Sequence, residues 1–148
     1  MAEEQEPDFT VVDADGAEDS YADSDVPGEF RRLTEALGAE QLAITLIRVP
    51  PYSDFEQGTG HRHERIEELY LVAEGTLTMR FGEEVREVGA GQVVRVGPGT
   101  VRSHRNEGPE PVEMWAISVQ AEVPDAVKVD DFWEPSEDAR QEARDADD

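Results

Sequence analysis

The chain of 148 residues contains no cysteine and only one lysine, Lys128. Without thiols, it forms no disulfide bond, no thiolate zinc site and no cysteine nucleophile. No apolar run approaches the ~20 residues that cross a bilayer. The N-terminal sequence MAEEQEPDF also lacks the cationic and apolar regions of a secretory signal. We therefore expect a soluble, cytoplasmic protein.

Basic residues are scarce, with 13 Lys and Arg against 36 Asp and Glu, and the formal net charge is −23. Nucleic acids and anionic membranes are bound by clustered Lys and Arg, so neither is an expected partner. Self-repulsion at this charge destabilises a compact chain in dilute buffer. At about 1 M salt the Debye length falls to roughly 3 Å and the repulsion is screened. We hypothesise a halophilic protein from an organism that accumulates salt.

Composition divides the chain into three parts, namely a central domain and two acidic ends. Residues 1–25 are acidic and poor in large apolar side chains, which predicts a largely flexible N-terminal segment. Residues 26–123 hold the apolar periodicity and are expected to form a barrel with an N-terminal arm. Residues 124–148 are predicted to be an acidic C-terminal tail.

Local patterns add detail at both ends of the chain. FTVV (9–12) is the one part of the N-terminal segment expected to dock, as an edge strand. PGEFRRLTEALG (27–38) has Pro near its start, apolar residues at helical spacing and a final Gly, which predicts a short helix. Phe132 and Trp133 are expected to anchor the tail to the barrel, and residues 136–148 are expected to be a frayed helix or disordered.

The central region has the period of β-strands. Short apolar-rich segments alternate with turns that contain glycine or proline, which is typical of an antiparallel sandwich or barrel. The predicted strands are LAITLIRV (42–49), ELYLVA (68–73), TLTMRF (76–81), EVREV (84–88), QVVRV (92–96), VRSHRN (101–106) and PVEMWAISV (111–119).

A histidine pair provides the first candidate for chemistry. His61 and His63 share one face if they lie on a strand, and a turn at 64–67 would let Glu68 of the next strand converge with them. Two imidazoles and a carboxylate on a rigid sheet suit a divalent metal. On its own the pair is weak evidence, since a solvated surface pair has the same pattern.

The intervals around this pair carry more information. His61-x-His63, four residues, Glu68, six residues and Gly75 resemble the first motif of the cupin superfamily. The opening glycine of that motif is missing, because its position holds Phe55. The resemblance covers roughly residues 42–120 and implies an all-β double-stranded β-helix, the cupin or jelly-roll barrel.

The second cupin motif is present with one decisive change. Its frame matches Gly91, Gly97-Pro98-Gly99 and Asn106, but the position of the family's histidine holds Arg102. A guanidinium has no lone pair for a metal and repels a divalent cation. Three arrangements stay open: Arg102 pairs with Glu68 and replaces the metal, it clamps an anionic ligand, or it swings out and His104 becomes a ligand through a bulge or register shift.

The resemblance implies a site of two groups of residues. The metal ligands would be His61, His63 and Glu68, with His104 as a fourth. The ligand contacts would be Arg102, Tyr70 and Asn106. The divalent metal would be iron, manganese, zinc, nickel or copper, and no residue is assigned a catalytic role.

Function is expected to be the binding of a small molecule, together with a divalent metal. The alternative is a mononuclear metal-dependent enzyme, either like a non-haem iron dioxygenase or a metal-assisted isomerase. A third hypothesis is a structural or regulatory dimer whose barrel is filled by side chains. The resemblance also implies a homodimer, and Leu69 and Leu71 on the outer strand face need a cover, either the N-terminal segment or a second subunit.

Overall fold

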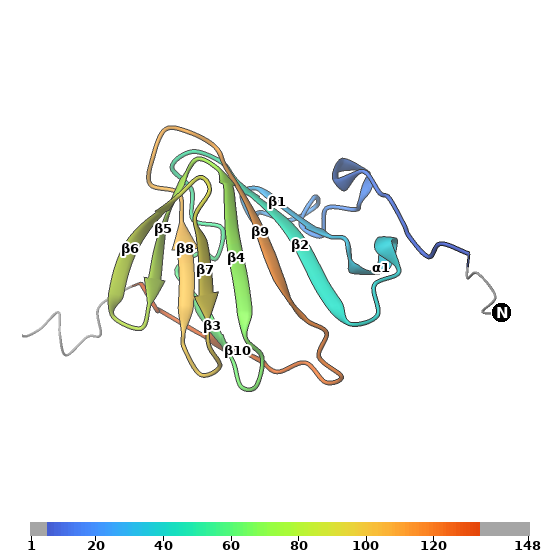
Figure 1. Ribbon diagram of the computed structural model, residues 1–148. Helices are drawn as coiled ribbons and strands as arrows, with labels where there is room; N and C mark the ends of the chain where they lie inside the picture. Colours follow the sequence, from blue (N-terminus) through green and yellow to red (C-terminus); the bar gives the residue numbers. More distant parts are fainter. Residues whose placement is uncertain (1–5, 134–148) are drawn as a thin grey trace, which may run out of the picture.

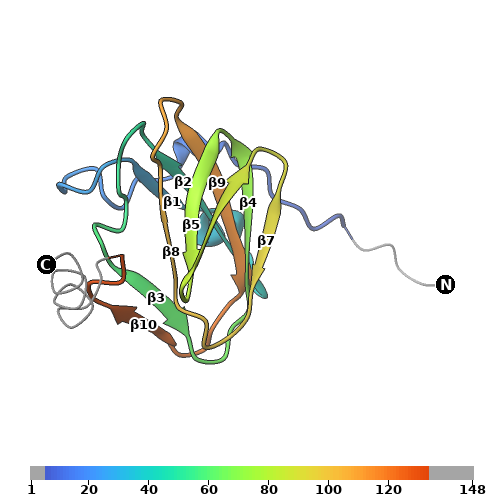
Figure 2. The same cartoon turned by 90° about the vertical axis from the view of Figure 1, so that its left-hand side faces the viewer.

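The computed structural model describes residues 6–133, which form two five-stranded antiparallel sheets lying face to face (Figures 1 and 2). The first sheet contains, in spatial order, β1 (Glu29–Arg32), β2 (Leu42–Val49), β9 (Val112–Val119), β4 (Glu68–Glu74) and β7 (Val93–Val96). The second contains β10 (Ala126–Val129), β3 (Gly60–His63), β8 (Arg102–Arg105), β5 (Thr76–Phe81) and β6 (Glu84–Gly89). The predicted all-β double-stranded β-helix is confirmed.

The core lies between the two sheets because each strand directs alternate side chains inward. Val72 of β4 and Met114 of β9 are register partners, and both are fully buried. Leu77 and Met79 of β5 are equally buried on the second sheet. Since residues two apart share a face, the inward position of Val72 also directs Tyr70 and Glu68 into the interior.

The opposite face of the first sheet carries a row of apolar side chains. Leu46, Trp115 and Leu71 are register partners across β2, β9 and β4. Trp115 and Leu71 are only half-buried and Leu69 is 38% exposed. The prediction that FTVV (9–12) docks as an edge strand is wrong, because this segment forms no strand and its Phe9 and Val11 are exposed.

The predicted helix at 27–38 is wrong in its first half. Glu29–Arg32 forms β1, and only Thr34–Leu37 is helical (α1). Pairing of β1 with β2 places Phe30 beside Ile47, where its ring packs 5.4 Å from that of Tyr21. Burial of this ring outweighs a weak helical preference.

Acidic residues before β1 also contact the sheets. A short 3-10 turn, η1 (Ala14–Gly16), begins this stretch. A carboxylate oxygen of Asp19 accepts hydrogen bonds from the backbone N–H groups of Tyr21 and Phe30. These bonds hold Tyr21 beside the inner face of the first sheet.

The C-terminal part contributes a strand that the sequence analysis missed. β10 lies within the segment assigned to the tail and pairs with β3, opposing Lys128 to His61. The expected anchor is confirmed, because Trp133 Nε1 donates to Ser103 Oγ at 2.7 Å and the Arg105 guanidinium lies 4.3 Å from the Trp133 ring centroid. The prediction for 136–148 falls outside the described residues.

Across residues 6–133, no helix is long and apolar enough to cross a membrane.

Candidate metal and ligand site

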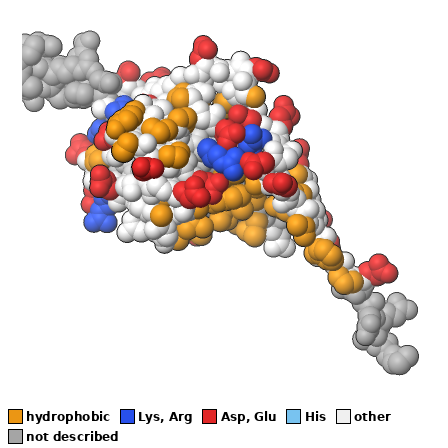
Figure 3. Space-filling view, turned by 90° about the horizontal axis from the view of Figure 1, so that it is seen from above, with side chains coloured by type: hydrophobic (Ala, Val, Ile, Leu, Met, Phe, Trp, Pro, Cys, Tyr) orange, Lys and Arg blue, Asp and Glu red, His pale blue; other side chains and the backbone are white. Residues whose placement is uncertain are grey.

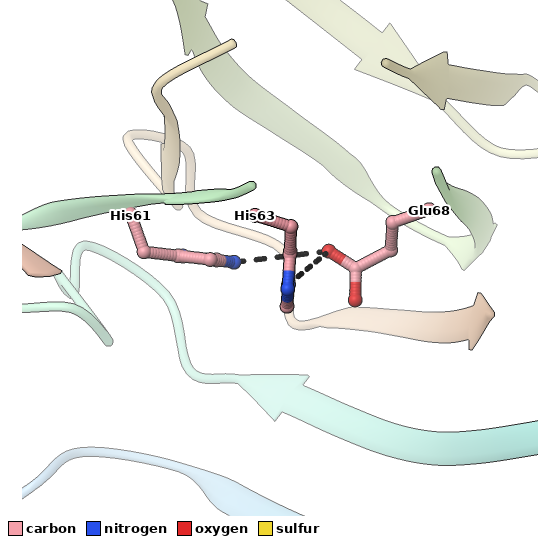
Figure 4. A group of neighbouring side chains, drawn as sticks. All are labelled: His61, His63 and Glu68. Carbon is pink, nitrogen blue, oxygen red and sulfur yellow. Dashed lines mark ion pairs between the residues drawn. The ribbon is translucent and has the colours of Figure 1, made fainter. Parts of the chain in front are cut away.

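His61, His63 and Glu68 meet at the inner surface of the barrel (Figure 4). Both imidazoles project from β3, and the carboxylate reaches them from the start of β4. His61 Nε2 lies 3.7 Å and His63 Nε2 lies 3.8 Å from Glu68 Oε1. The geometry follows from strand parity on β3 and from the turn at 64–67, which carries the chain from one sheet to the other.

A carboxylate orients His63 from behind. His63 Nδ1 lies 2.7 Å from Asp125 Oδ1. Asp125 Oδ2 accepts the backbone N–H groups of Arg65 and Ile66 at 3.0 and 3.1 Å. An Nδ1–H directed at a carboxylate leaves the Nε2 lone pair free for the site. Asp125 was not found from the sequence, because it lies 62 residues from His63 with no motif linking them.

His61 has a similar partner in Glu56, whose Oε1 lies 3.3 Å from Nδ1. Glu56 belongs to the loop between β2 and β3, and it too was not predicted from the sequence. Both histidines of the pair therefore have a carboxylate at Nδ1 and direct Nε2 toward Glu68. This is the arrangement of metal-binding histidines whose second nitrogen is held by an acid.

The same contacts set the charges of the site. Burial alone would raise the pKa of Glu68, but hydrogen bonds from His61, Tyr70 and Arg102 outweigh it and lower the pKa to about 2. Burial would lower the pKa of His61, yet hydrogen bonding to Glu56 and Glu68 raises it to about 9. Without a metal, the site therefore holds an ionised Glu68 beside a protonated His61.

Arg102 pairs with Glu68, which is the first of the three arrangements considered above. Its Nη2 donates to Glu68 Oε1 at 2.9 Å, Nε to the Tyr70 hydroxyl at 3.2 Å, and Nη1 to the carbonyl of Thr100 at 3.0 Å. The side chain is 1% exposed and does not line the cavity beside the site. Its geometry therefore does not support the ligand contact assigned to it from the sequence.

Tyr70 lines the cavity and donates its hydroxyl to Glu68. His104 is buried, with its ring 5.7 Å from that of Phe55, and its Nε2 lies 4.0 Å from Glu56 Oε1. It stands outside the three-residue group, since Arg102 has not swung out. Burial lowers the pKa of His104, which keeps its imidazole neutral.

Asn106, expected as a ligand contact, holds a loop instead. Its Nδ2 donates to the carbonyls of Val49, Pro50 and Glu110, and its Oδ1 accepts the backbone N–H of Gly108. The side chain is 1% exposed and does not line the cavity beside the histidines. The amide thus stabilises the approach to β9 and does not contribute to the candidate site.

The group borders a cavity of about 660 Å³ between the sheets, lined on one side by His61, His63 and Glu68. Volumes of about 300–1,000 Å³ are typical of small-molecule sites. A second hollow of about 580 Å³, between β6 and β7, contains none of these residues. The chemistry and the space for a ligand therefore coincide in the first cavity.

The donors fit a divalent metal. Two ligands bound at about 2.1 Å to one metal lie roughly 3.0–3.4 Å apart. The separations of 3.7 and 3.8 Å exceed this by only a few tenths of an ångström. Arg102 opposes metal binding, because it binds the same Glu68 oxygen that both imidazoles face.

Comparisons with known proteins agree with this architecture. The Cupin domain family matches residues 46–119. No curated protein matches the chain in sequence. Solved structures of similar fold include the polyketide cyclase RemF from Streptomyces resistomycificus, with 18% identity, a TM-score of 0.66, and coverage of 91% of this chain and 92% of that one.

Two further similar structures come from other bacteria. The cupin-superfamily sugar phosphate isomerase from Silicibacter pomeroyi has 18% identity, a TM-score of 0.64 and 76% coverage of each chain. A candidate sugar phosphate isomerase from Acidithiobacillus ferrooxidans has 23% identity and a TM-score of 0.57, over 64% of this chain and only 60% of that one. These identities establish likeness of fold alone. Because the family match covers half of the 148 residues and includes the histidine pair, Glu68 and Arg102, the chain belongs to the cupin superfamily.

Proposed function

We propose that this protein binds a small organic molecule in the 660 Å³ cavity, beside a divalent metal held by His61, His63 and Glu68. The observation that carries the proposal is the convergence of one ligand atom from each of the three side chains within 4.8 Å of one another, at the wall of that cavity. Each imidazole is held at Nδ1 by a carboxylate, so the nitrogens are preorganised for a cation.

Arg102 has a positioning role in this proposal. It fixes the rotamer of Glu68 and keeps the carboxylate ionised, which a metal requires. It also competes for that carboxylate, so we expect weaker metal binding than at a cupin site with a histidine in this position. Iron, manganese, zinc, nickel and copper are all compatible with two imidazoles and a carboxylate.

A mononuclear metal-dependent enzyme is the second candidate. Three protein ligands on one wall would leave the cavity side of a metal open for an oxygen of the substrate. The similar structures described as a sugar phosphate isomerase and a polyketide cyclase make isomerisation and cyclisation the reaction classes to test first. Oxygenation at a non-haem iron centre is the remaining alternative.

Metal binding tests the proposal directly. Protein without a histidine tag is stripped with a chelator and titrated with Zn²⁺, Mn²⁺, Ni²⁺ and Fe²⁺. We expect about one equivalent of metal, lost in His63→Ala and retained in the control His104→Gln. Failure of all four metals to bind, or equal binding by His63→Ala, contradicts the proposal. Turnover of a metal-loaded sample with a candidate substrate would then favour the enzyme.

We also infer a homodimer formed through the outer face of the first sheet. Half-buried Trp115 and Leu71 lie there beside exposed Leu69 and Val93, and the view from above shows hydrophobic side chains gathered along one side of the molecule (Figure 3). A cover on this face would remove apolar surface from water. Light scattering should give a dimer for the wild type and a monomer for Leu71→Arg, and a monomeric wild type contradicts the inference.

A further inference from the structure

One row of the cavity floor crosses four strands of the first sheet. Tyr70 on β4 opposes Ala116 on β9, Ala116 opposes Thr45 on β2, and Thr45 opposes Arg32 on β1. All four residues line the cavity. Strands lie about 4.8 Å apart, so the row spans about 14 Å from Tyr70 to Arg32. The small side chains of Ala116 and Thr45 leave the middle of this floor open.

Aromatic rings form a wall beside the floor. The ring centroids of Tyr21, Phe30 and Phe55 lie 5.4 to 5.9 Å from one another, and all three residues line the cavity. Tyr21 comes from the acidic N-terminal part, so this wall is completed by residues outside the two sheets. Flat apolar groups pack favourably against such rings.

Apart from the protonated His61 at the metal end, the cationic side chains of the cavity lining lie at its rim. Arg32 is exposed, its guanidinium lies 5.5 Å from the Phe30 ring centroid, and it makes no ion pair within residues 6–133. Lys128 also lines the cavity but is paired with Asp130 at 3.3 Å. Among the arginine and lysine residues that line the cavity, Arg32 alone has no ion pair in the described part of the chain, which suits a single negative charge at this end.

A phosphoryl group would find little support here. Phosphate is usually bound by several cations or by the N-terminus of a helix. Away from His61 and the metal end, the cavity lining has only Arg32 and Lys128 as cations, and it includes no residue of α1 or η1. The Arg32 end of the cavity therefore disfavours a phosphoryl group.

We propose that the ligand is an elongated, flat, largely apolar molecule, with an oxygen donor near His61, His63 and Glu68 and one acidic group at Arg32. Its body lies along the open floor and against the aromatic wall. This proposal specifies the class of ligand that the cavity binds. Only its first part, the oxygen donor near the metal, rests on the proposed function. The acidic end depends on Arg32, which the metal does not contact.

The probe for this proposal is 6-hydroxy-2-naphthoate, a fluorescent bicyclic molecule with a hydroxyl and a carboxylate at opposite ends. Its fluorescence anisotropy is measured during titration of Zn²⁺-treated protein. We expect saturable one-site binding that is about tenfold weaker in Arg32→Gln. The control Arg86→Gln removes the same charge from β6, away from the cavity, and should change the affinity less than twofold.

Two comparisons separate the ligand class from its alternatives. 2-Naphthol, which lacks the carboxylate, should bind equally to the wild type and to Arg32→Gln. Ala116→Leu fills the floor and should abolish naphthoate binding while zinc binding is retained. Absence of saturable naphthoate binding, equal affinity in Arg32→Gln, or displacement of the naphthoate by an equal concentration of fructose 6-phosphate overturns the proposal.

The metal and ligand hypotheses fail in different ways. If the wild-type protein binds naphthoate but no zinc, the proposed metal site is contradicted. Naphthoate binding to metal-free protein, with the same dependence on Arg32, upholds the ligand class in that case. Zinc binding without any naphthoate binding rejects the ligand class and leaves the metal site intact.

Discussion

Glu68 is shared by a fixed cation and by two imidazoles, and this sharing sets the chemistry of the site. Arg102 and Tyr70 both donate to Oε1, the atom that His61 and His63 face. A metal would enter on the imidazole side, opposite a guanidinium that cannot lose its proton. Charge neutrality and hydrogen bonding at this one carboxylate therefore decide how tightly a metal is held.

Asp125 should control metal affinity without touching the metal. Asp125→Asn removes the negative charge that holds Nδ1 of His63 and orients its ring. Metal affinity should fall by about 10- to 100-fold, measured by competition with a chromophoric zinc chelator. Asp23→Asn, an exposed position, is the matched control and should leave the affinity unchanged. An Asp125→Asn variant with wild-type affinity contradicts this role.

His61 should make the stability of the metal-free protein depend on pH. Its pKa is about 9 in the folded state, above the ordinary histidine value of 6.5. Protonated His61 therefore stabilises the folded state fully below pH 6.5, and this stabilisation is lost as the pH rises through about 9. The free energy of unfolding from urea titrations should fall over this window, and the fall should be smaller in His61→Gln. An identical slope in both proteins excludes His61 as the cause.

At the scale of elements, strand parity and turns place the site. Parity on β4 directs Glu68 and Tyr70 inward together, and a glycine turn at Gly75 then starts β5. The predicted spans 42–49 and 76–81 coincide with β2 and β5, because continuous apolar alternation ended by proline or glycine marks strand ends clearly. β10 was missed because its four residues lie in an acidic stretch and depend on pairing with β3.

Gly75 should tolerate substitution less well than the comparable turn residue Gly82. Both have positive φ, 78° and 59°, so alanine at either costs about 1–2 kcal/mol of backbone strain. A Cβ on Gly75 would also lie 2.5 Å from the carbonyl oxygen of Pro111, whereas none of the neighbouring atoms lies within 4 Å at Gly82. Urea unfolding should therefore show a larger loss of stability for Gly75→Ala, and equal losses contradict the steric argument.

At the scale of the whole molecule, acidic charge dominates the surface. Figure 3 shows a group of basic side chains bordered by acidic ones near the middle of the face seen from above, and further basic side chains at its left edge. Arg48, for example, forms ion pairs with Asp15, Glu29 and Glu113. Local pairing of this kind relieves only a small part of a net charge of −23.

The stability of the protein should accordingly rise with salt. The melting temperature is expected to increase as KCl is raised from about 0.1 M, where the Debye length is about 10 Å, to several molar. The same series for a variant with ten surface acids replaced by Gln and Asn should show a smaller increase. A melting temperature that is independent of KCl contradicts the halophilic interpretation.

The sequence by itself determined the barrel, most of its strands and the meeting of His61, His63 and Glu68, because alternation and motif intervals are local properties of the chain. Only the tertiary structure decided the orientation of Arg102 toward Glu68, the carboxylate of Asp125 behind His63, and the loss of Asn106 from the site. Sheet pairing and loop closure bring the residues of these contacts together from distant parts of the chain. The direction of each side chain and its charge balance then depend on those neighbours, which no local sequence pattern specifies.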